Sequence, residues 1–269
     1  MLTNSYLSKM KKMGIIGAGW LGIRLARLFN ENFEIYATTR SADKFESLIQ
    51  EKIHPTMMEF SGEQVQPIQP WSELKQLDLL ILTVNFSKRT EISVLKNRFE
   101  NVSRFIKGFE GPIFLMSSIG VYPSMEMEIE EDTITESELQ PNIRSVELQM
   151  QTAFPQINIL RLAGLMGDDR FLSKYKIKDT HQAANHIHYE DIAGVIEKMI
   201  SVKSSAKTYN VVAPKHPTKQ DIMDQQLGEA TTIEAEKPAG RIILTKKVIN
   251  ELGYVYKRPD PRFFKEAAR

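Results

Sequence analysis

Three glycines in the pattern G-x-G-x-x-G follow a short apolar stretch near the N-terminus, and they constrain the fold more than any other feature. The stretch reads Ile15-Ile16-Gly17-Ala18-Gly19-Trp20-Leu21-Gly22. Gly17 permits a tight turn, Gly19 leaves the backbone open to a pyrophosphate, and Gly22 lets a helix lie close to the strand. A helix over Leu21–Asn30 would then offer free N–H groups and a positive dipole end to the phosphates. The pattern predicts a strand–turn–helix unit that binds a dinucleotide; the alternative is that the glycines serve packing alone.

The end of the next predicted strand, Glu34–Thr38, bears on which dinucleotide binds. An NAD site usually has Asp or Glu there to accept a hydrogen bond from the ribose 2′-OH. This chain has Thr39, Arg40 and Ser41 instead. A guanidinium suits a 2′-phosphate, so we expect NADP rather than NAD. The alternative is that Arg40 is a solvated surface residue and Ser41 merely caps a helix over Ala42–Gln50.

Short apolar runs alternate with amphipathic stretches along most of the chain, as in a parallel sheet with crossover helices. The runs are rich in Ile, Leu and Val without strict alternation, as expected of strands covered on both faces. They are Met13–Ile16, Glu34–Thr38, Thr56–Phe60, Leu79–Val84, Ile113–Ser117, Ile157–Leu162 and Thr208–Val212. This pattern predicts an α/β fold, a Rossmann-type, doubly wound parallel sheet of about seven strands with a small C-terminal substrate module.

The expected organisation has three parts. Residues 1–12 are expected to form a flexible N-terminal extension. Residues 13–165, completed by 191–213, form the dinucleotide-binding domain, and residues 166–190 with 214–269 form the small substrate module. Apolar spacing predicts helices from Ile92, ended by Gly108, and over Asn142–Thr152 and Ile192–Ile200.

Composition narrows the class of protein. The 269 residues include 35 Lys plus Arg and 34 Asp plus Glu, a formal net charge of +1. A near-neutral chain lacks the charge that attracts nucleic acid or anionic lipid, so we expect neither partner. Cysteine is absent, which excludes disulfides, thiolate metal sites and a cysteine nucleophile and fits a cytoplasmic location. We expect a small-molecule substrate, and the sequence leaves a homodimer open.

Four ordered segments carry a resemblance to a known superfamily. Ser117-Ser118-Ile119-Gly120-Val121-Tyr122 is similar to the Ser-Ser-x-x-Val-Tyr-Gly segment of the extended short-chain dehydrogenase/reductase superfamily, in its epimerase/dehydratase branch. Arg161–Gly167 resembles that family's sixth strand and loop, Asn185–Ala193 its strand-to-helix segment, and Tyr209–Val212 its last strand. The resemblance spans about Met13 to Phe264.

The resemblance implies a set of cofactor and catalytic positions. Ser118 matches the family's catalytic Ser/Thr, and Tyr122 is a second catalytic candidate, although a structural role suits it better. The implied cofactor-binding residues, together with those of the glycine loop, are Gly17, Gly19, Trp20, Leu21, Gly22, Thr39, Arg40, Ser41, Thr83, Val84, Asn85, Ser117, Leu162 and Gly164. No metal is expected.

One departure from the family pattern concerns its chemistry. The family uses a Tyr-x-x-x-Lys pair one turn apart on a helix, and the corresponding positions here are Asn142 and Val146. A register error cannot restore the pair, because the segment from Pro123 to Leu160 contains neither Tyr nor Lys. An amide cannot act as a general acid near neutral pH, and valine carries no charge. The chain therefore resembles atypical members that lack the dyad.

Other polar residues have both a functional and a purely structural interpretation. Lys174, Tyr175, Lys176 and Lys178 could clamp an anionic group or form a solvated face. Arg144 and Glu147, on the altered helix, could substitute for the missing catalytic pair, and an exposed i,i+3 pair explains them equally well.

His186 and His188 point to one side of a strand, but no further ligand spacing supports a metal site. Asp191 is expected to stabilise the N-terminus of its helix. An acidic run after the fifth strand is expected to keep a surface loop soluble; it comprises Glu126, Glu128, Glu130, Glu131 and Asp132.

The resemblance implies an NAD(P)-binding, epimerase/dehydratase-like protein. As an enzyme it would be an oxidoreductase or isomerase of a small polar substrate, sugar-like or carbonyl, with Ser118 binding the reacting oxygen. The alternative is a non-catalytic NADP(H)-binding sensor or regulatory protein, which the loss of the Tyr and Lys favours.

Overall fold

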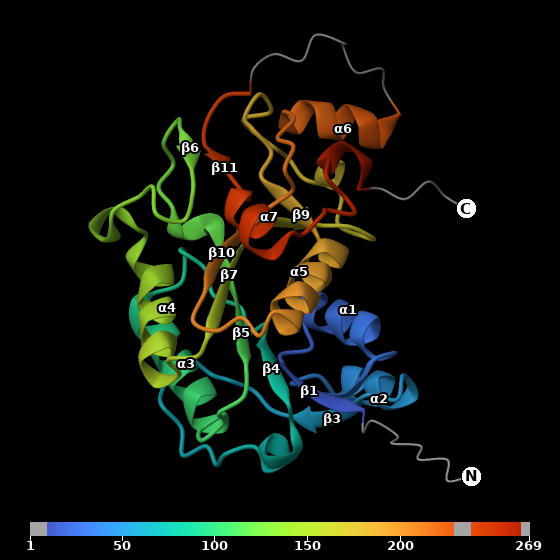
Figure 1. Ribbon diagram of the computed structural model, residues 1–269, viewed down its shortest axis with the longest axis vertical. Coiled ribbons are helices and arrows are strands. Elements are labelled where there is room, and N and C mark those ends of the chain that lie inside the picture. Colours follow the sequence, from blue (N-terminus) through green and yellow to red (C-terminus); the bar gives the residue numbers. More distant parts are fainter. Residues whose placement is uncertain (1–9, 229–237, 265–269) are drawn as a thin grey trace, which may run out of the picture.

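A seven-stranded, entirely parallel sheet forms the centre of the molecule (Figure 1). The computed structural model describes residues 10–228 and 238–264. The strand order is β10-β7-β5-β4-β1-β2-β3. The strands are β1 (Lys11–Ile16), β2 (Phe33–Thr39), β3 (His54–Met57), β4 (Leu79–Leu82), β5 (Ile113–Ser118), β7 (Asn158–Leu162) and β10 (Thr208–Val211). All seven predicted strands are present, so the Rossmann-type prediction is confirmed; β3 alone is displaced, by two to three residues.

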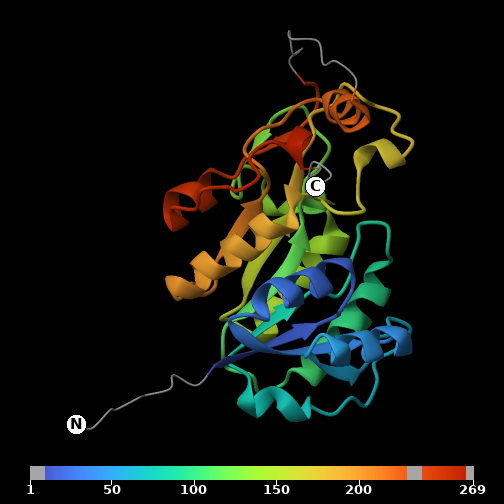
Figure 2. The same cartoon turned by 90° about the vertical axis from the view of Figure 1, so that its right-hand side faces the viewer.

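Amphipathic helices cover both faces of the sheet (Figures 1 and 2). One face carries α1 (Trp20–Phe29), α2 (Ala42–Gln50) and α5 (Tyr189–Ser201). The other carries α3 (Ile92–Phe105) and α4 (Pro141–Ala153). The buried side chains of their apolar stripes, such as Leu25, Phe99 and Ile196, pack against the strands, and each contributes about 1.5–3 kcal/mol to stability. This double coverage explains why the strands are apolar on both faces.

The strand order reverses between β1 and β4, which are neighbours in the sheet although β2 and β3 lie between them in sequence. In open α/β sheets such a switch point leaves a crevice outside the carboxyl ends of the strands, where ligands bind. The glycine pattern follows β1 directly, so the fold places it at this crevice.

A second, smaller core lies above the sheet in the orientation of Figure 1. It includes Met166, Leu172, Ile222 and Phe264. The elements around it are β8 (Gly164–Met166), β9 (His186–His188), α6 (Lys219–Leu227), and the short helices Leu172–Lys174 and Pro261–Phe263. All belong to the predicted substrate module, except for the start of β8.

The rest of the C-terminal part packs on the main domain instead. Strand β11 (Ile242–Ile243) pairs with β6 (Glu128–Ile129), and α7 (Lys246–Leu252) contacts α5 and β10. The surface loop expected after β5, Tyr122–Glu138, therefore contains a short strand and a 3-10 turn, Glu136–Glu138, and a further 3-10 turn, Ile119–Val121, precedes it. A last 3-10 turn, Ser72–Gln76, precedes β4.

The predicted N-terminal extension, residues 1–12, overlaps the first strand. Lys11 and Lys12 belong to β1, and the backbone N–H of Lys12 donates to Asp78 at 2.7 Å, so the prediction was wrong for these two residues. Residues 1–9 lie outside the described part of the chain.

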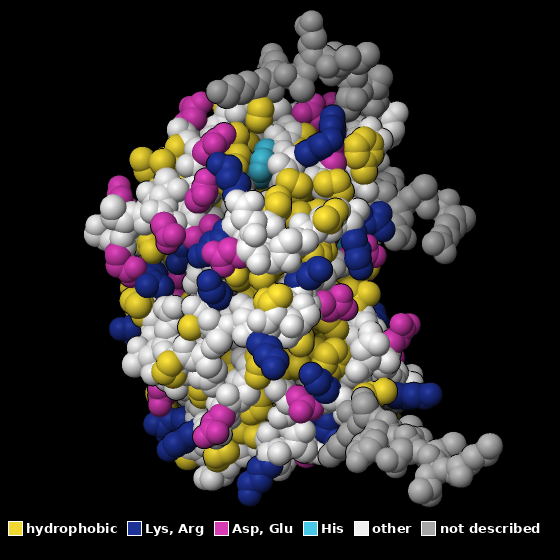
Figure 3. Space-filling model, in the orientation of Figure 1, with side chains coloured by type: hydrophobic (Ala, Val, Ile, Leu, Met, Phe, Trp, Pro, Cys, Tyr) yellow, Lys and Arg dark blue, Asp and Glu magenta, His cyan; other side chains and the backbone are white. Residues whose placement is uncertain are grey.

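Acidic and basic side chains are interspersed over the face seen in Figure 3, in keeping with the near-zero net charge. Within residues 10–228 and 238–264, no helix is both long and apolar enough to cross a membrane.

Candidate functional site: a dinucleotide cleft and a neighbouring pocket

The three glycines of the loop differ in what surrounds them. Gly17 has φ +104°, its N–H donates to Thr38 Oγ1 at 2.8 Å, and its carbonyl accepts from Thr83 Oγ1 at 2.5 Å. A Cβ at Gly22 would collide with the Gly17 carbonyl, so only glycine lets α1 approach this closely. At Gly19 a Cβ would have no described atom within 4 Å. The chain therefore bends at Gly17, packs at Gly22 and leaves open space at Gly19.

A cleft of about 770 Å³ opens beside this loop at the carboxyl ends of β1, β2 and β4. Eight of the predicted cofactor-binding residues line it: Gly17, Gly19, Thr39, Arg40, Ser41, Thr83, Val84 and Asn85. Its cations are Arg40, Lys44 and Arg98, and its carboxylates are Glu59 and Glu63.

A pocket of about 190 Å³ continues the cleft toward β5 and β7. The two share Gly19, Thr83, Val84 and Asn85. Further predicted residues line the pocket, namely Trp20, Leu21, Ser117, Ser118 and Leu162. Gly22 and Gly164 line neither: Gly22 packs α1 on the loop, and Gly164 lies in β8 with its Cα facing the His186 ring.

Arg40 and Ser41 line the cleft, and each also has the protein contact that its structural alternative predicted. Arg40 lines the cleft, but its side chain is 77% exposed and forms an ion pair with Glu59 at 3.2 Å. Ser41 lines the cleft and also caps α2, accepting a hydrogen bond from the Lys44 N–H at 3.4 Å. The Lys44 ammonium reaches back to the Ala18 carbonyl at 3.4 Å.

Two asparagines one turn apart on α3 hold the outer wall of the cleft. The buried Asn101 amide donates to the carbonyls of Ser61 and Gln64, both at 2.9 Å, and accepts from the Gln66 N–H at 2.7 Å. Asn97 donates to the Gly62 carbonyl at 3.3 Å. Sequence reasoning missed both residues, because an asparagine within a helical pattern carries no signal of a distant loop partner.

The two serines at the end of β5 have different surroundings. Ser118 is half-buried, lines the small pocket and accepts from the Gly120 N–H at 3.0 Å. Its own O–H has no acceptor among the described residues, so it can donate to a ligand. Ser117 is buried and donates to Glu147 at 2.6 Å.

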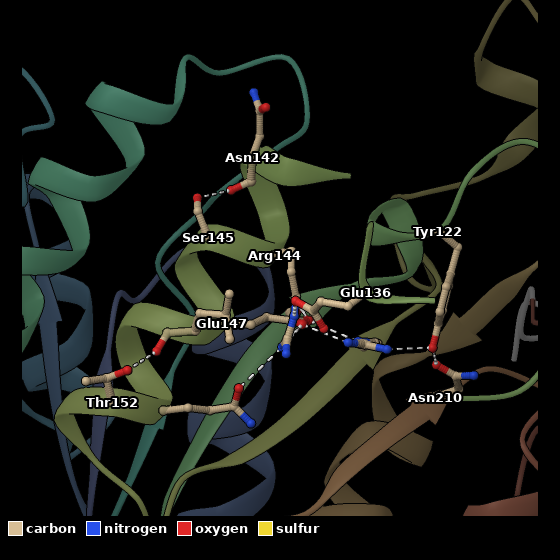
Figure 4. Close-up of polar contacts among 12 residues, drawn as sticks. Tyr122, Glu136, Asn142, Arg144, Ser145, Glu147, Thr152 and Asn210 are labelled. Carbon is tan, nitrogen blue, oxygen red and sulfur yellow. Dashed lines mark hydrogen bonds and ion pairs between the residues drawn. The ribbon is translucent and has the colours of Figure 1, made fainter. Parts of the chain in front are cut away.

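Glu147 belongs to a buried polar network behind β5 (Figure 4). Its carboxylate accepts from Arg161 Nη2 at 2.8 Å and Nε at 3.1 Å, and from Arg144 Nη1 at 3.2 Å. Burial alone would lower the pKa of Arg161, but Glu147 raises it above its ordinary value, so the guanidinium stays charged. The expected i,i+3 pair of Arg144 and Glu147 is present, but the expectation that it is exposed was wrong, because Glu147 is fully buried and bound by Ser117 and Arg161.

Tyr122 lies at the far end of the same network. Its hydroxyl accepts from Arg161 Nη1 at 2.9 Å and donates to Asn210 Oδ1 at 2.7 Å. Burial raises its pKa, which makes proton release harder, and the side chain lines neither described pocket. This position agrees with the structural alternative for Tyr122; a catalytic role stays an untested prediction.

The two candidate dyad positions on α4 both face protein. The Asn142 amide donates to the carbonyls of Lys88 at 3.2 Å and Thr90 at 2.5 Å. Val146 is fully buried in the core under α3 and α4. Neither side chain lines the cleft or the pocket.

Two acidic residues are buried by contacts that the sequence did not predict. Asp191 is buried and binds the C-terminal segment, accepting from Tyr254 Oη at 2.8 Å and from the Lys257 N–H at 2.7 Å. It also lies in the first turn of α5, in keeping with the predicted stabilisation of the helix N-terminus, and the helix is capped by His188, whose Nδ1 accepts from the Glu190 N–H at 3.3 Å. Glu131 is buried rather than solvating a loop, because it accepts from the Asn210 N–H at 2.6 Å.

The remaining candidates lie away from the cleft. Lys174, Tyr175, Lys176 and Lys178 are exposed and line neither pocket. His186 and His188 lie in β9, and no cluster of three or more potential ligands that could hold a metal occurs among the described residues.

Comparison with known proteins adds to this picture. No protein-family model matches the chain. Protein YeeZ of Escherichia coli (strain K12) is 26% identical over 269 residues, covering 94% of this chain and 98% of that protein.

Two solved structures share the fold. The human epimerase family protein SDR39U1 with NADPH is 15% identical with a TM-score of 0.64, covering 94% of this chain and 97% of that one. The dTDP-glucose 4,6-dehydratase of Bacillus anthracis in complex with NAD is 12% identical with a TM-score of 0.68, covering 93% and 94%.

At these identities the similarity establishes architecture, and it does so over nearly the whole length of each chain. The resemblance read from the four sequence segments is confirmed at that level: this chain shares its Rossmann-type fold with a solved epimerase family protein and a solved dehydratase.

Proposed function

We propose that the cleft binds NADP(H) and that the small pocket beside Ser118 receives the nicotinamide end and a substrate. The observation that carries the proposal is the open space at Gly19, directly at the N-terminus of α1 and between the two pockets. A pyrophosphate needs close approach to backbone N–H groups at a helix N-terminus, and this arrangement provides it.

Particular residues would hold each part of the cofactor. Gly17 to Gly19 and the first N–H groups of α1 would contact the pyrophosphate. Arg40 and Ser41 would contact the 2′-phosphate, since a guanidinium forms paired, charge-assisted hydrogen bonds with phosphate. Leu162 and Ser117, which line the small pocket, would lie at the nicotinamide end. A bound nicotinamide supplies or accepts a hydride.

The best-supported activity is an oxidoreductase or isomerase of a small polar substrate. Ser118 would donate its O–H to the reacting oxygen, because this hydroxyl faces the pocket and has no acceptor among the described residues. Without a Tyr–Lys pair, a proton must come from another group or from water. General acid–base assistance contributes about 10²–10⁴-fold, so we expect little or no turnover of ordinary nucleotide sugars.

Calorimetric titration with NADPH and NADH tests cofactor binding. We expect NADPH to bind with the higher affinity, and failure of both to bind would overturn the proposal.

The second candidate is a non-catalytic NADP(H)-binding sensor. It is favoured by Asn142 and Val146, whose side chains are held by backbone carbonyls and by the core. A turnover screen with NADPH and a panel of carbonyl compounds separates the two candidates: oxidation of NADPH with any of them supports the enzyme, and binding without turnover supports the sensor.

A further inference from the structure

Arg170 closes a tight turn that follows β8. The N–H of Arg170 donates to the Gly167 carbonyl at 2.9 Å, the Gly167 N–H donates to the Arg170 carbonyl at 3.2 Å, and Gly167 has φ +125°. This turn carries Arg170 to the wall of the small pocket, which Ser118 at the end of β5 also lines.

The guanidinium is held in place by an aromatic ring. Its central carbon lies 4.2 Å from the centroid of the Trp20 ring. Trp20 is itself fixed, because its indole N–H donates to Asp169 at 2.8 Å. A cation stacked on an anchored indole loses little further freedom when it binds an anion.

The neighbouring carboxylates are already engaged by another arginine. Arg24 donates to Asp168 at 2.7 Å and to Asp169 at 2.8 Å. Within the part of the chain that the structure describes, no carboxylate lies within 4 Å of the Arg170 guanidinium in an ion pair.

Among the described residues, the pocket wall contains no carboxylate. Arg170 is its one charged residue, and the rest of the described wall is partly polar, as at Asn85 and Ser118, and partly apolar, as at Phe86 and Leu165. A guanidinium without a carboxylate partner favours an anion in such a pocket, because a charge-assisted hydrogen bond is stronger in a partly buried site than in water.

We propose that Arg170 binds the carboxylate or phosphate of the substrate, so that the substrate is a small anionic carbonyl or hydroxyl compound whose reacting oxygen faces Ser118. This inference rests on the proposed function for the role of Ser118, but the anion site itself can be tested alone. The sequence pointed to the exposed lysines at 174, 176 and 178 for this purpose, whereas Arg170 is the cation that lines the pocket.

The test uses two ketones of the same chain length, 2-oxobutanoate and butan-2-one, in which a carboxylate of the first is replaced by a methyl group in the second. Each is titrated calorimetrically into the full chain saturated with NADP⁺. We expect the wild type to bind 2-oxobutanoate about tenfold or more tightly than butan-2-one. Arg170→Gln should remove this preference, and Arg170→Lys should keep part of it. Lys174→Gln is the matched control, since it removes a charge from the same loop outside the pocket and should leave the preference intact.

Three outcomes would overturn the proposal. The first is equal affinity for the two probes, or no binding of either, in the wild type. The second is an unchanged preference in Arg170→Gln. The third is a tenfold loss of NADPH affinity in Arg170→Gln, which would assign the guanidinium to the cofactor pyrophosphate. If the wild type binds no NADP(H), the proposed function fails, and the same titrations without cofactor still decide whether Arg170 binds the anion.

Discussion

The glycine loop after β1 and the helix α4 behind β5 place polar groups in opposite ways. At the loop, no described atom lies within 4 Å of a Cβ added at Gly19, and Ser118, which lines the adjoining pocket, keeps an O–H without a described acceptor. On α4, the Glu147 carboxylate receives hydrogen bonds from Ser117, Arg161 and Arg144. The first region keeps its hydrogen-bonding capacity for a ligand, and the second uses it to hold the protein together.

This difference indicates different roles for α4 and for the glycine loop in this chain. In the family that it resembles, the corresponding helix presents reactive side chains to a substrate. Here its buried face carries Val146 and Glu147, which bind the core and the network. We infer that α4 serves stability in this chain while the loop retains the geometry for a dinucleotide.

The largest expected effect comes from breaking the network. Glu147→Ala should lower the free energy of unfolding by about 3–5 kcal/mol, because it leaves the buried Arg161 without its carboxylate. Urea denaturation measures this change.

Glu100→Ala on α3 is the matched control, because Glu100 also pairs with an arginine on its own helix, Arg104, but at the surface. We expect a loss of about 0.3–0.5 kcal/mol there. Similar losses in the two variants would mean that the α4 network is no more important than a surface ion pair.

The next prediction separates function from folding within the loop. Gly19→Val should weaken NADPH binding about a hundredfold or more, equivalent to about 2.8 kcal/mol, by filling the space that the pyrophosphate needs. The fold should survive, since Gly19 has φ −77° and no described atom within 4 Å of an added Cβ.

Gly22→Val is the contrasting variant, because its Cβ would collide with the Gly17 carbonyl. We expect it to lose stability as well as binding. Calorimetry with NADPH and thermal unfolding of both variants check the pair. Unchanged NADPH affinity in Gly19→Val would show that the cleft is not the binding site.

The sequence predicted the loop well and the network poorly, for a physical reason. The loop is local: β1, the three glycines and α1 are contiguous, so their spacing alone specifies the turn. The network joins Ser117, Glu147, Arg161 and Asn210 from four separate elements. Only the sheet order brings these together, and Glu147 on its helix looks like half of an ordinary surface pair.

Arg170 was missed on similar grounds. Its importance depends on the turn after β8 and on Trp20, about 150 positions earlier in the sequence, and on Arg24 occupying both nearby carboxylates. The run of lysines that follows is more conspicuous in the sequence but remains in solvent.

A third region sharpens the comparison, because it buries a polar group that is not satisfied. His186 Nδ1 is buried with no described partner, and burial lowers the pKa of this histidine from 6.5 to about 4. Between these pH values the unfolded chain binds more protons than the folded one, so stability should fall as the pH drops from about 6.5 toward 4. Above about pH 6.5 the His186 ring is neutral in both the folded and the unfolded chain, so its protonation no longer changes the stability.

The shift would correspond to about 3 kcal/mol for a fully buried ring, and we expect about 2 kcal/mol because the side chain keeps some exposure. Denaturant midpoints measured for the wild type and His186→Gln at pH 7 and pH 4.5 test this. The variant should lose less stability on acidification, although His188 and His216, whose pKa values burial also lowers, leave part of the slope. An identical slope in both proteins would contradict the assignment to His186.

The smallest expected effect concerns the edge of the cleft, where the 2′-phosphate of the proposed cofactor would compete with Glu59 for the Arg40 guanidinium. A charge-assisted contact with a 2′-phosphate contributes about 1.5–3 kcal/mol, but the guanidinium is mostly exposed and must leave Glu59, so we expect the lower end. NADPH should therefore bind about tenfold more tightly than NADH, and Arg40→Ala should remove most of that difference.

Glu59→Gln should increase the preference for NADPH slightly, because it frees Arg40 from its competing partner. Arg27→Ala is the control, since Arg27 is also an exposed arginine paired with a glutamate, Glu51, but lies outside the cleft. Calorimetry with the two cofactors measures all four proteins. Equal affinities of the wild type for NADPH and NADH would assign Arg40 to the surface ion pair alone and leave the cleft without a basis for choosing between the two dinucleotides.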